Sequence, residues 1–132
     1  MKKNGKFEMP LLRLCLTNWE MNMVYFLLQM IWGIQMAASK DHTLANAHAH
    51  LNLIGWVGFA LYGFYYHVVP SAAQGRLPRL HLVVSVLAVG TIAPGIAIVK
   101  SGGGDAMAIL GSFLTLASAL IFLVTVIRSR TA

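Results

Sequence analysis

Charged side chains are scarce in this 132-residue chain, and acidic ones are the scarcest. Only 11% of the residues are charged, with four Asp or Glu against ten Lys or Arg, whereas soluble domains carry about 25% charged residues. Hydrophobic residues make up 58% of the chain, and its mean hydropathy is +0.69. The composition therefore predicts an integral membrane protein with one compact domain, residues 1–132.

Cysteine and paired catalytic groups are also scarce. Cys15 is the single cysteine, so an intrachain disulfide is excluded. The sequence contains neither a Ser-His-Asp arrangement nor a carboxylate pair, so hydrolase chemistry has no support. The three glycines of Gly102–Gly104 lack the flanking strand and lysine of a phosphate-binding loop, and they predict a turn. No cleavage site of a signal peptide follows the basic residues Met1–Glu8.

Four apolar segments predict an all-α fold with four transmembrane helices in an up-down bundle. Met21–Ala38 contains no charge, and as a helix it would rise about 27 Å, close to the hydrocarbon thickness of about 30 Å. The second segment is Thr43–Val69, the third is Leu80–Val99 and the fourth is Ala106–Ile127. Pro94 is expected to kink the third segment unless neighbouring groups satisfy the carbonyl that it frees.

The remaining polar and aromatic residues give further expectations. Met1–Met9 is expected to be a disordered or interfacial tail, and Pro10 is expected near the start of a helix. Polar residues of the first span should face other helices, and tyrosines near the end of the second should form an interfacial aromatic belt. The first group is Asn22, Gln29 and Gln35, and the second is Tyr62, Tyr65 and Tyr66.

The net charge of +6 lies beside apolar segments, so it indicates membrane orientation rather than binding to nucleic acid. Basic residues exceed acidic ones on one side of the predicted spans, and the positive-inside rule places that side, with both termini, in the cytoplasm. We expect the bacterial inner membrane as the location. The basic side has Lys2, Lys3, Lys6, Arg13, Arg76, Arg79, Arg128 and Arg130, and the other side has Lys40 and Lys100 with Asp41 and Asp105.

Two histidines, His48 and His50, lie near the start of the second segment. In a helix they differ by roughly 200° about the axis and by about 3 Å along it, so they point to nearly opposite faces. One metal ion cannot readily bind both without unwinding the helix, whereas two partners on opposite sides can. Ionisable residues inside a membrane span are functional candidates by default.

Three interpretations of this pair remain open. Each imidazole can bond to a neighbouring helix, ligate haem iron, or bind copper or zinc together with His42. A haem needs a wide apolar slot, and Gly55 and Trp56 follow on the same segment as a small residue and a planar wall. Asn52 comes four residues after His48, one helical turn along, where it can orient a ligand or bond another helix.

The other histidines are interpreted as peripheral. His42 is expected at the outer mouth, as a loop residue or as part of a path for metal or protons. His67 and His81 are expected at the inner membrane interface beside Arg76 and Arg79.

From Asn46 to about Gly95 the sequence resembles subunit I of the haem–copper oxidases, particularly the C-type oxidases and nitric oxide reductases. In that family an H-x-H pair lies on the tenth of twelve helices. The resemblance is carried by His-Ala-His at 48–50, Leu-Ile-Gly-Trp-Val at 53–57, Leu-Tyr-Gly-Phe-Tyr-Tyr-His-Val-Val-Pro at 61–70 and Arg-Leu-His-Leu at 79–82.

The resemblance implies that His48 and His50 are each an axial haem ligand, the first for an active-site haem and the second for a low-spin haem. The family's twelve helices are similar to three four-helix units around a pseudo-threefold axis. By this likeness the chain is one unit of a homotrimer, with a b-type haem between His48 of one protomer and His50 of the next.

A haem held by two histidines favours electron transfer, or haem or gas sensing, over oxygen activation. The His-His pair of the oxidase copper centre is absent, so no complete oxidase active site is evident. The alternatives are a copper- or zinc-binding membrane protein that uses His42, His48 and His50, and a structural or assembly module without a cofactor.

Overall fold

The computed structural model describes residues 5–130, with the side chains of that range apart from those of residues 5–12 and Cys15. This part of the chain is helical and contains no strand. Three helices are long and apolar enough to cross a membrane, over Leu16–Ser39, Leu77–Lys100 and Ala106–Arg130. The chain is therefore an all-helical protein of the integral membrane class, as the composition predicts.

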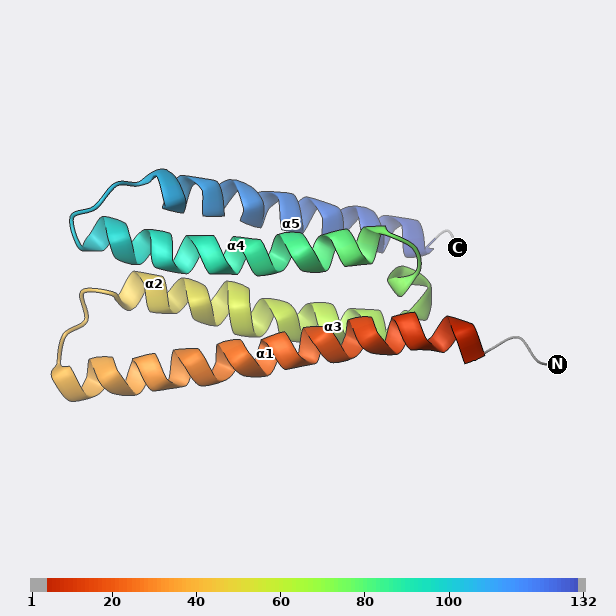
Figure 1. Cartoon of the computed structure of the whole chain (residues 1–132), viewed down its shortest axis with the longest axis horizontal. Coiled ribbons are helices and arrows are strands. Elements are labelled where there is room, and N and C mark those ends of the chain that lie inside the picture. Colours follow the sequence, from red (N-terminus) through yellow and green to blue (C-terminus); the bar gives the residue numbers. More distant parts are fainter. Residues whose placement is uncertain (1–4, 131–132) are drawn as a thin grey trace.

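Figure 1 shows the long helices and a composite rod between them. The first helix, α1, covers Gly5–Ser39, while α4 covers Leu77–Lys100 and α5 covers Ala106–Arg130. The rod occupies the second predicted segment, and no residue separates its three pieces. These pieces are the α-helix α2 (Ala45–His50), the π-helix η1 (Leu51–Val57) and the α-helix α3 (Gly58–Val68), and a short 3₁₀ helix, η2 (Pro70–Ala73), follows.

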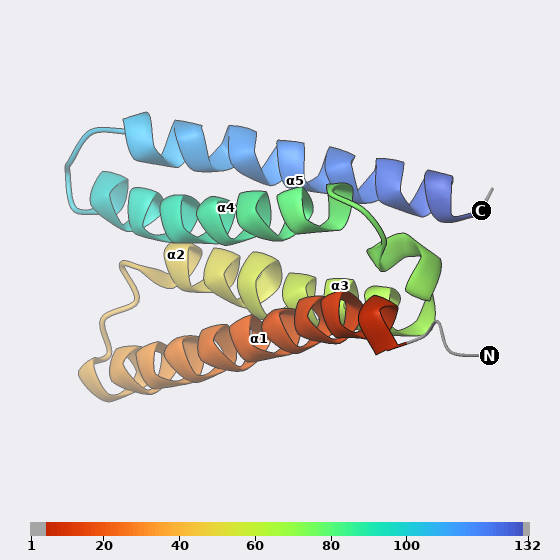
Figure 2. The ribbon, with the colours of Figure 1, turned by 45° about the vertical axis from the view of Figure 1, so that its right-hand side comes forward.

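The helices are arranged as an open row in which neighbours run in opposite directions. The rod packs against α1 on one side, and its α2 and η1 pieces pack against α4 on the other. The most extensive packing joins α4 to α5, and α5 is not among the elements that pack on α1. Figures 1 and 2 show the same order from two directions, with the start of α1 and the end of α5 at one end of the row. The up-down order is as predicted, and α5 also contacts α3 through the rings of Phe122 and Tyr65, while α1 and α5 lie at the two edges.

Two glycines explain why α4 and α5 pack so closely. A Cβ at Gly95 would lie 2.5 Å from the backbone nitrogen of Ala108, and a Cβ at Gly111 would lie 2.5 Å from the backbone of Ile92. Both contacts are too short for any side chain, so only glycine allows the two backbones to approach in this way.

The beginning of the chain differs from its prediction. Helix α1 already includes Gly5–Met9 and continues through Pro10, so these five residues are not a disordered tail. Lys2 and Lys3, in the same predicted tail, lie outside the described residues. The buried side chain of Leu14 packs with Tyr66 and Ala72, which anchors the early part of α1 to the end of the rod.

The polar residues of the first span divide between two environments. Asn22 and Gln29 are buried, as predicted, whereas Gln35 is exposed. The Asn22 side-chain amide donates a hydrogen bond to the backbone carbonyl of Trp56 in η1. This bond joins α1 to the π-helix.

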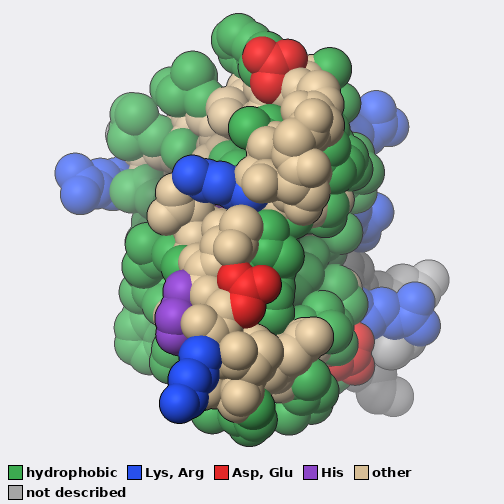
Figure 3. Space-filling view, turned by 90° about the vertical axis from the view of Figure 1, so that its left-hand side faces the viewer, with side chains coloured by type: hydrophobic (Ala, Val, Ile, Leu, Met, Phe, Trp, Pro, Cys, Tyr) green, Lys and Arg blue, Asp and Glu red, His purple; other side chains and the backbone are tan. Residues whose placement is uncertain are grey.

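The two ends of the row differ in charge. All five arginines belong to the end where the chain enters α1, starts α4 and finishes α5. Figure 3 looks onto the opposite end, where basic and acidic side chains both appear in the loops. There Asp41 accepts hydrogen bonds from the Thr43 hydroxyl and backbone N–H, and these bonds lower the pKa of Asp41. The Gly102–Gly104 segment forms the predicted turn, with Gly102 at φ +85°.

Candidate functional site

The His-x-His pair lies at the junction between an α-helix and a π-helix. His48 and His50 belong to α2, and η1 begins at the next residue, Leu51. A π-helix has a wider turn than an α-helix, is rare, and often marks a functional site. Sequence periodicity assumed a regular α-helix through this region, so the π-helix was not predicted.

His48 faces the first helix of its own chain. Its ring meets the edge of the Trp32 ring, with centroids 6.1 Å apart and planes at 85°. A Cβ at Gly33 would lie 3.3 Å from the His48 Cε1 atom, so the glycine makes room for the imidazole. The Nδ1 atom of His48 is buried and has no hydrogen-bond partner within the described part of the chain. Buried polar atoms of proteins normally have a hydrogen-bond partner, so this nitrogen is an exception that needs an explanation.

His50 has a different environment and a defined tautomer. Its Nδ1 atom lies 2.8 Å from the backbone carbonyl oxygen of Asn46. Because a carbonyl oxygen can only accept, Nδ1 donates the bond and carries the proton. In the neutral ring the lone pair then lies on Nε2, and the His50 side chain is half-buried. A metal-ligating histidine commonly has its second ring nitrogen bonded to a carbonyl in this way.

The other residues predicted for the site are placed as follows. Asn52 lies inside η1, so its four-residue spacing from His48 does not correspond to one α-helical turn, and its Oδ1 atom is buried without a partner. Gly55 is buried, and a Cβ there would lie 3.1 Å from Tyr25 and 3.3 Å from Val89. The Trp56 ring packs against Phe26, 5.0 Å between centroids. Within one protomer Gly55 therefore permits close packing of helices.

The third histidine of the metal alternative is apart from the pair. His42 is exposed in the loop before α2. Across the described residues no three His, Cys, Asp or Glu side chains gather closely enough to hold a metal ion. A copper or zinc site that uses this histidine therefore needs ligands from more than one protomer.

The membrane depth predicted for His81 stays a prediction, but its side chain is enclosed by protein, because His81 is completely buried. Its Nδ1 atom is 2.9 Å from the Tyr66 hydroxyl oxygen, and its Nε2 atom is buried without a partner among the described residues. His81 lies one turn inside α4, which begins at Leu77, so its side chain turns toward α3 and α5. His67 is exposed at the end of α3.

The tyrosines predicted for an interfacial belt, Tyr62, Tyr65 and Tyr66, contact other helices of the same chain. Tyr66 is completely buried, and the rings of Tyr62 and Phe122 contact His81 at centroid distances of 4.5 and 5.3 Å. Beside them the Ser85 hydroxyl donates to the His81 carbonyl and lies 2.7 Å from the Ser118 hydroxyl. These groups form a polar and aromatic cluster where α3, α4 and α5 meet.

A signal for this cluster exists in the sequence. His81, Ser85, Ala88 and Ile92 recur at the three- and four-residue spacing of one helix face, and all four are buried. That stripe identifies the inner face of α4 and includes the histidine.

No known protein family matches this chain, and no characterised protein sequence or solved structure is detectably similar to it. The likeness to haem–copper oxidases thus rests on the motifs at residues 48–82 alone.

Proposed function

We propose that this protein is a membrane haem protein, similar to one four-helix unit of haem–copper oxidase subunit I, that assembles as a homotrimer. The rod α2–η1–α3 is then a fourth membrane-spanning helix beside the three long ones. His48 of one protomer and His50 of the next are the two axial ligands of a haem b.

The observation that carries this proposal is the state of His50. The Nδ1 bond to Asn46 leaves the lone pair on Nε2, and neutral imidazole with a free nitrogen is the form that binds haem iron. The ring takes part in none of the aromatic contacts described for this protomer. His50 is therefore a ligand with its orientation set and its coordinating atom unused.

His48 fits the second ligand position by its chemistry. Its buried Nδ1 has no partner among the residues that the structure describes, and its ring faces Trp32 of α1. Because the two imidazoles have different surroundings, they are better suited to binding groups shared with two neighbouring protomers than to binding one metal ion together. When bound, a bis-His haem supplies one-electron transfer, while this chain holds the imidazoles and excludes water from them.

The open row supports assembly. Its outer faces carry large apolar side chains, and the packing within one protomer leaves them uncovered. A closed bundle would bury its helices against one another, whereas a row leaves faces for neighbouring copies and for lipid. We place both termini in the cytoplasm and the protein in a bacterial inner membrane, on the arginines at one end.

The test is a reduced-minus-oxidised absorption spectrum of protein purified after expression with ample haem. We expect the bands of a b-type haem, and we expect His48→Ala and His50→Ala each to abolish them or to convert the haem to high spin. His67→Ala is the matched control, because His67 is exposed at the far end of α3, and it should leave the spectrum unchanged. Native mass spectrometry should give three chains per particle.

Other results would contradict the proposal. Copper or zinc retained without haem, and lost in the His42→Ala, His48→Ala and His50→Ala variants, would establish the metal-binding alternative. A third outcome is a purified protein that contains neither haem nor metal. If substitution of both His48 and His50 then leaves the phenotype of the cells unchanged, the protein is a structural module.

A further inference from the structure

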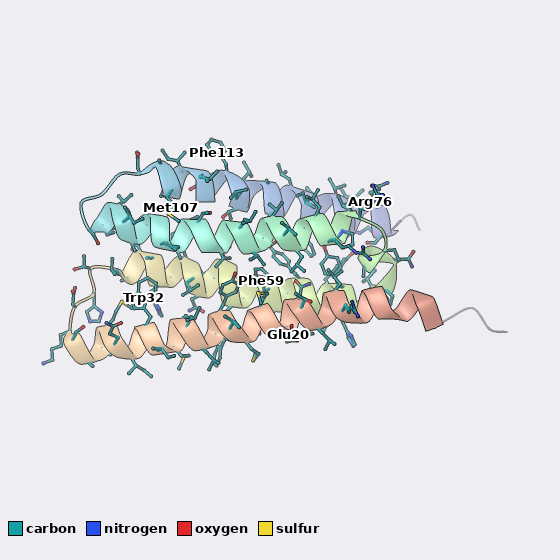
Figure 4. The ribbon with its side chains drawn as sticks, viewed as in Figure 1. Glu20, Trp32, Phe59, Arg76, Met107 and Phe113 are labelled. Carbon is teal, nitrogen blue, oxygen red and sulfur yellow. The ribbon has the colours of Figure 1, made fainter. Side chains whose placement is uncertain are left out.

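A cavity of about 560 Å³ opens where the chain turns from α3 into α4, far from the His-x-His pair. It lies between η2, the loop before α4, the first turn of α4 and the last turns of α5. Arg76, labelled in Figure 4, lies at this end of the row, where the start of α1 and the end of α5 also lie.

The lining of this cavity is polar on one side and apolar on the other. Arg76, Gln74 and Arg128 line it at the end of the row, where the helices α4 and α5 begin and finish. Leu77 and Pro78 line it in the first turn of α4, and Leu80 lines it one turn beyond Arg76, inside the span. Leu80 is 52% exposed, so the apolar side opens toward the surface of a membrane-spanning helix.

The polar side favours a negatively charged group. Two arginines contribute to it, and no carboxylate is among those lining residues that the structure describes. The N-cap of the 24-residue helix α4 is Arg76, and no side-chain hydrogen bond caps the helix start there. The positive end of the α4 dipole therefore adds to the attraction that the arginines provide, although Pro78 supplies no backbone N–H there.

We propose that this cavity binds the phosphate group of an anionic phospholipid. Arg76 contacts the phosphate at the membrane surface, Arg128 adds positive charge beside it, and the glycerol and the first part of the acyl chains lie along Leu80. A free phosphate ion would use the arginines equally well but would leave the apolar side unused. The combination of a basic end and a lipid-facing apolar end is the pattern of a lipid headgroup site.

The test compares two arginine variants in the full-length protein, purified in detergent and stripped of lipid. Binding of phosphatidylglycerol and of phosphatidylcholine is measured by native mass spectrometry. We expect tighter binding of phosphatidylglycerol, and we expect Arg76→Gln to weaken it about fivefold, the effect typical of one basic residue at a membrane surface. Arg79→Gln is the matched control, because Arg79 is exposed in the same turn but does not line the cavity.

Leu80→Gln tests the apolar side separately. We expect this substitution to weaken binding of phosphatidylglycerol and to leave binding of inorganic phosphate unchanged. Equal losses in Arg76→Gln and Arg79→Gln would overturn the proposal in favour of diffuse charge attraction. Displacement of phosphatidylglycerol by millimolar inorganic phosphate, with no effect of Leu80→Gln, would instead identify a site for the free ion. None of these outcomes depends on the haem spectrum, so the lipid site is tested independently of the proposed function.

Discussion

His81 and Tyr66 are a polar pair that the fold removes completely from its surface. The hydrogen bond between them joins α4 to α3. A polar group buried in such surroundings needs its partner, because its desolvation is otherwise uncompensated. The pair therefore contributes to holding the row together at the arginine-rich end.

Substitution of this pair should show strong coupling. We expect Tyr66→Phe to lower the free energy of unfolding by about 1 kcal/mol, since hydrogen bonds between membrane helices contribute on that scale. In a His81→Phe background the same change should have a smaller effect, because the bond to His81 is already absent and only the hydrogen bond with Thr125 is left to lose. Unfolding in a denaturing detergent, followed by circular dichroism, measures the cycle. Additive losses in the double variant would show that the hydrogen bond contributes nothing.

Among the helices, contact between α4 and α5 depends on glycine at points where the backbones meet. We expect Gly95→Ala to destabilise the protein by about 1–3 kcal/mol, because the new Cβ would overlap the backbone of Ala108. Gly90→Ala is the matched control in the same helix. A Cβ at Gly90 meets nothing within 4 Å, so this change should be neutral or stabilising by up to about 1 kcal/mol. Thermal unfolding in mild detergent distinguishes the two, and equal effects would contradict the packing argument.

The bounds of a helix could be predicted where they follow from the length of an apolar segment. They could not be predicted where they depend on contacts with other helices. The predicted third and fourth segments, Leu80–Val99 and Ala106–Ile127, lie within α4 and α5, which extend at most three residues farther. The wide turn of η1 could not be predicted, because it depends on backbone hydrogen bonds and on Asn22 from another helix.

At the candidate site the sequence could indicate the direction of side chains but not their partners. The two-residue spacing of His48 and His50 predicts different faces, and their different surroundings in the structure agree with that geometry. The stripe of His81, Ser85, Ala88 and Ile92 marks the inner face of α4, but that Tyr66 is the partner of His81 depends on how α3 and α4 meet, which no local pattern specifies.

For the whole molecule, the surface of the row is suited to lipid and to other copies. Apolar side chains on its outer helices are largely exposed, and Phe113, which is 68% exposed, points away from the row in Figure 4. On α1 the residues Ile31 and Ile34 are 66% and 65% exposed. Exposed apolar area of this extent is typical of a membrane-embedded or assembled protein.

The charge difference between the two ends predicts the orientation in the membrane. We expect a green fluorescent protein fused after Ala132 to fluoresce in bacterial cells and alkaline phosphatase at the same point to be inactive, because both report a cytoplasmic C-terminus. The same two reporters inserted in the Gly102–Gly104 turn should give the reverse pattern. Matching results at both positions would contradict the orientation.

Gly5 at the start of α1 and Arg130 at the finish of α5 belong to the same end of the row. A short polar linker is then enough to connect the tail of one copy to the head of the next, without another passage through the hydrocarbon layer. Tandem fusions of two or three repeats should consequently insert in the same sense as the single repeat. They would allow one histidine at a time to be altered in a chosen copy.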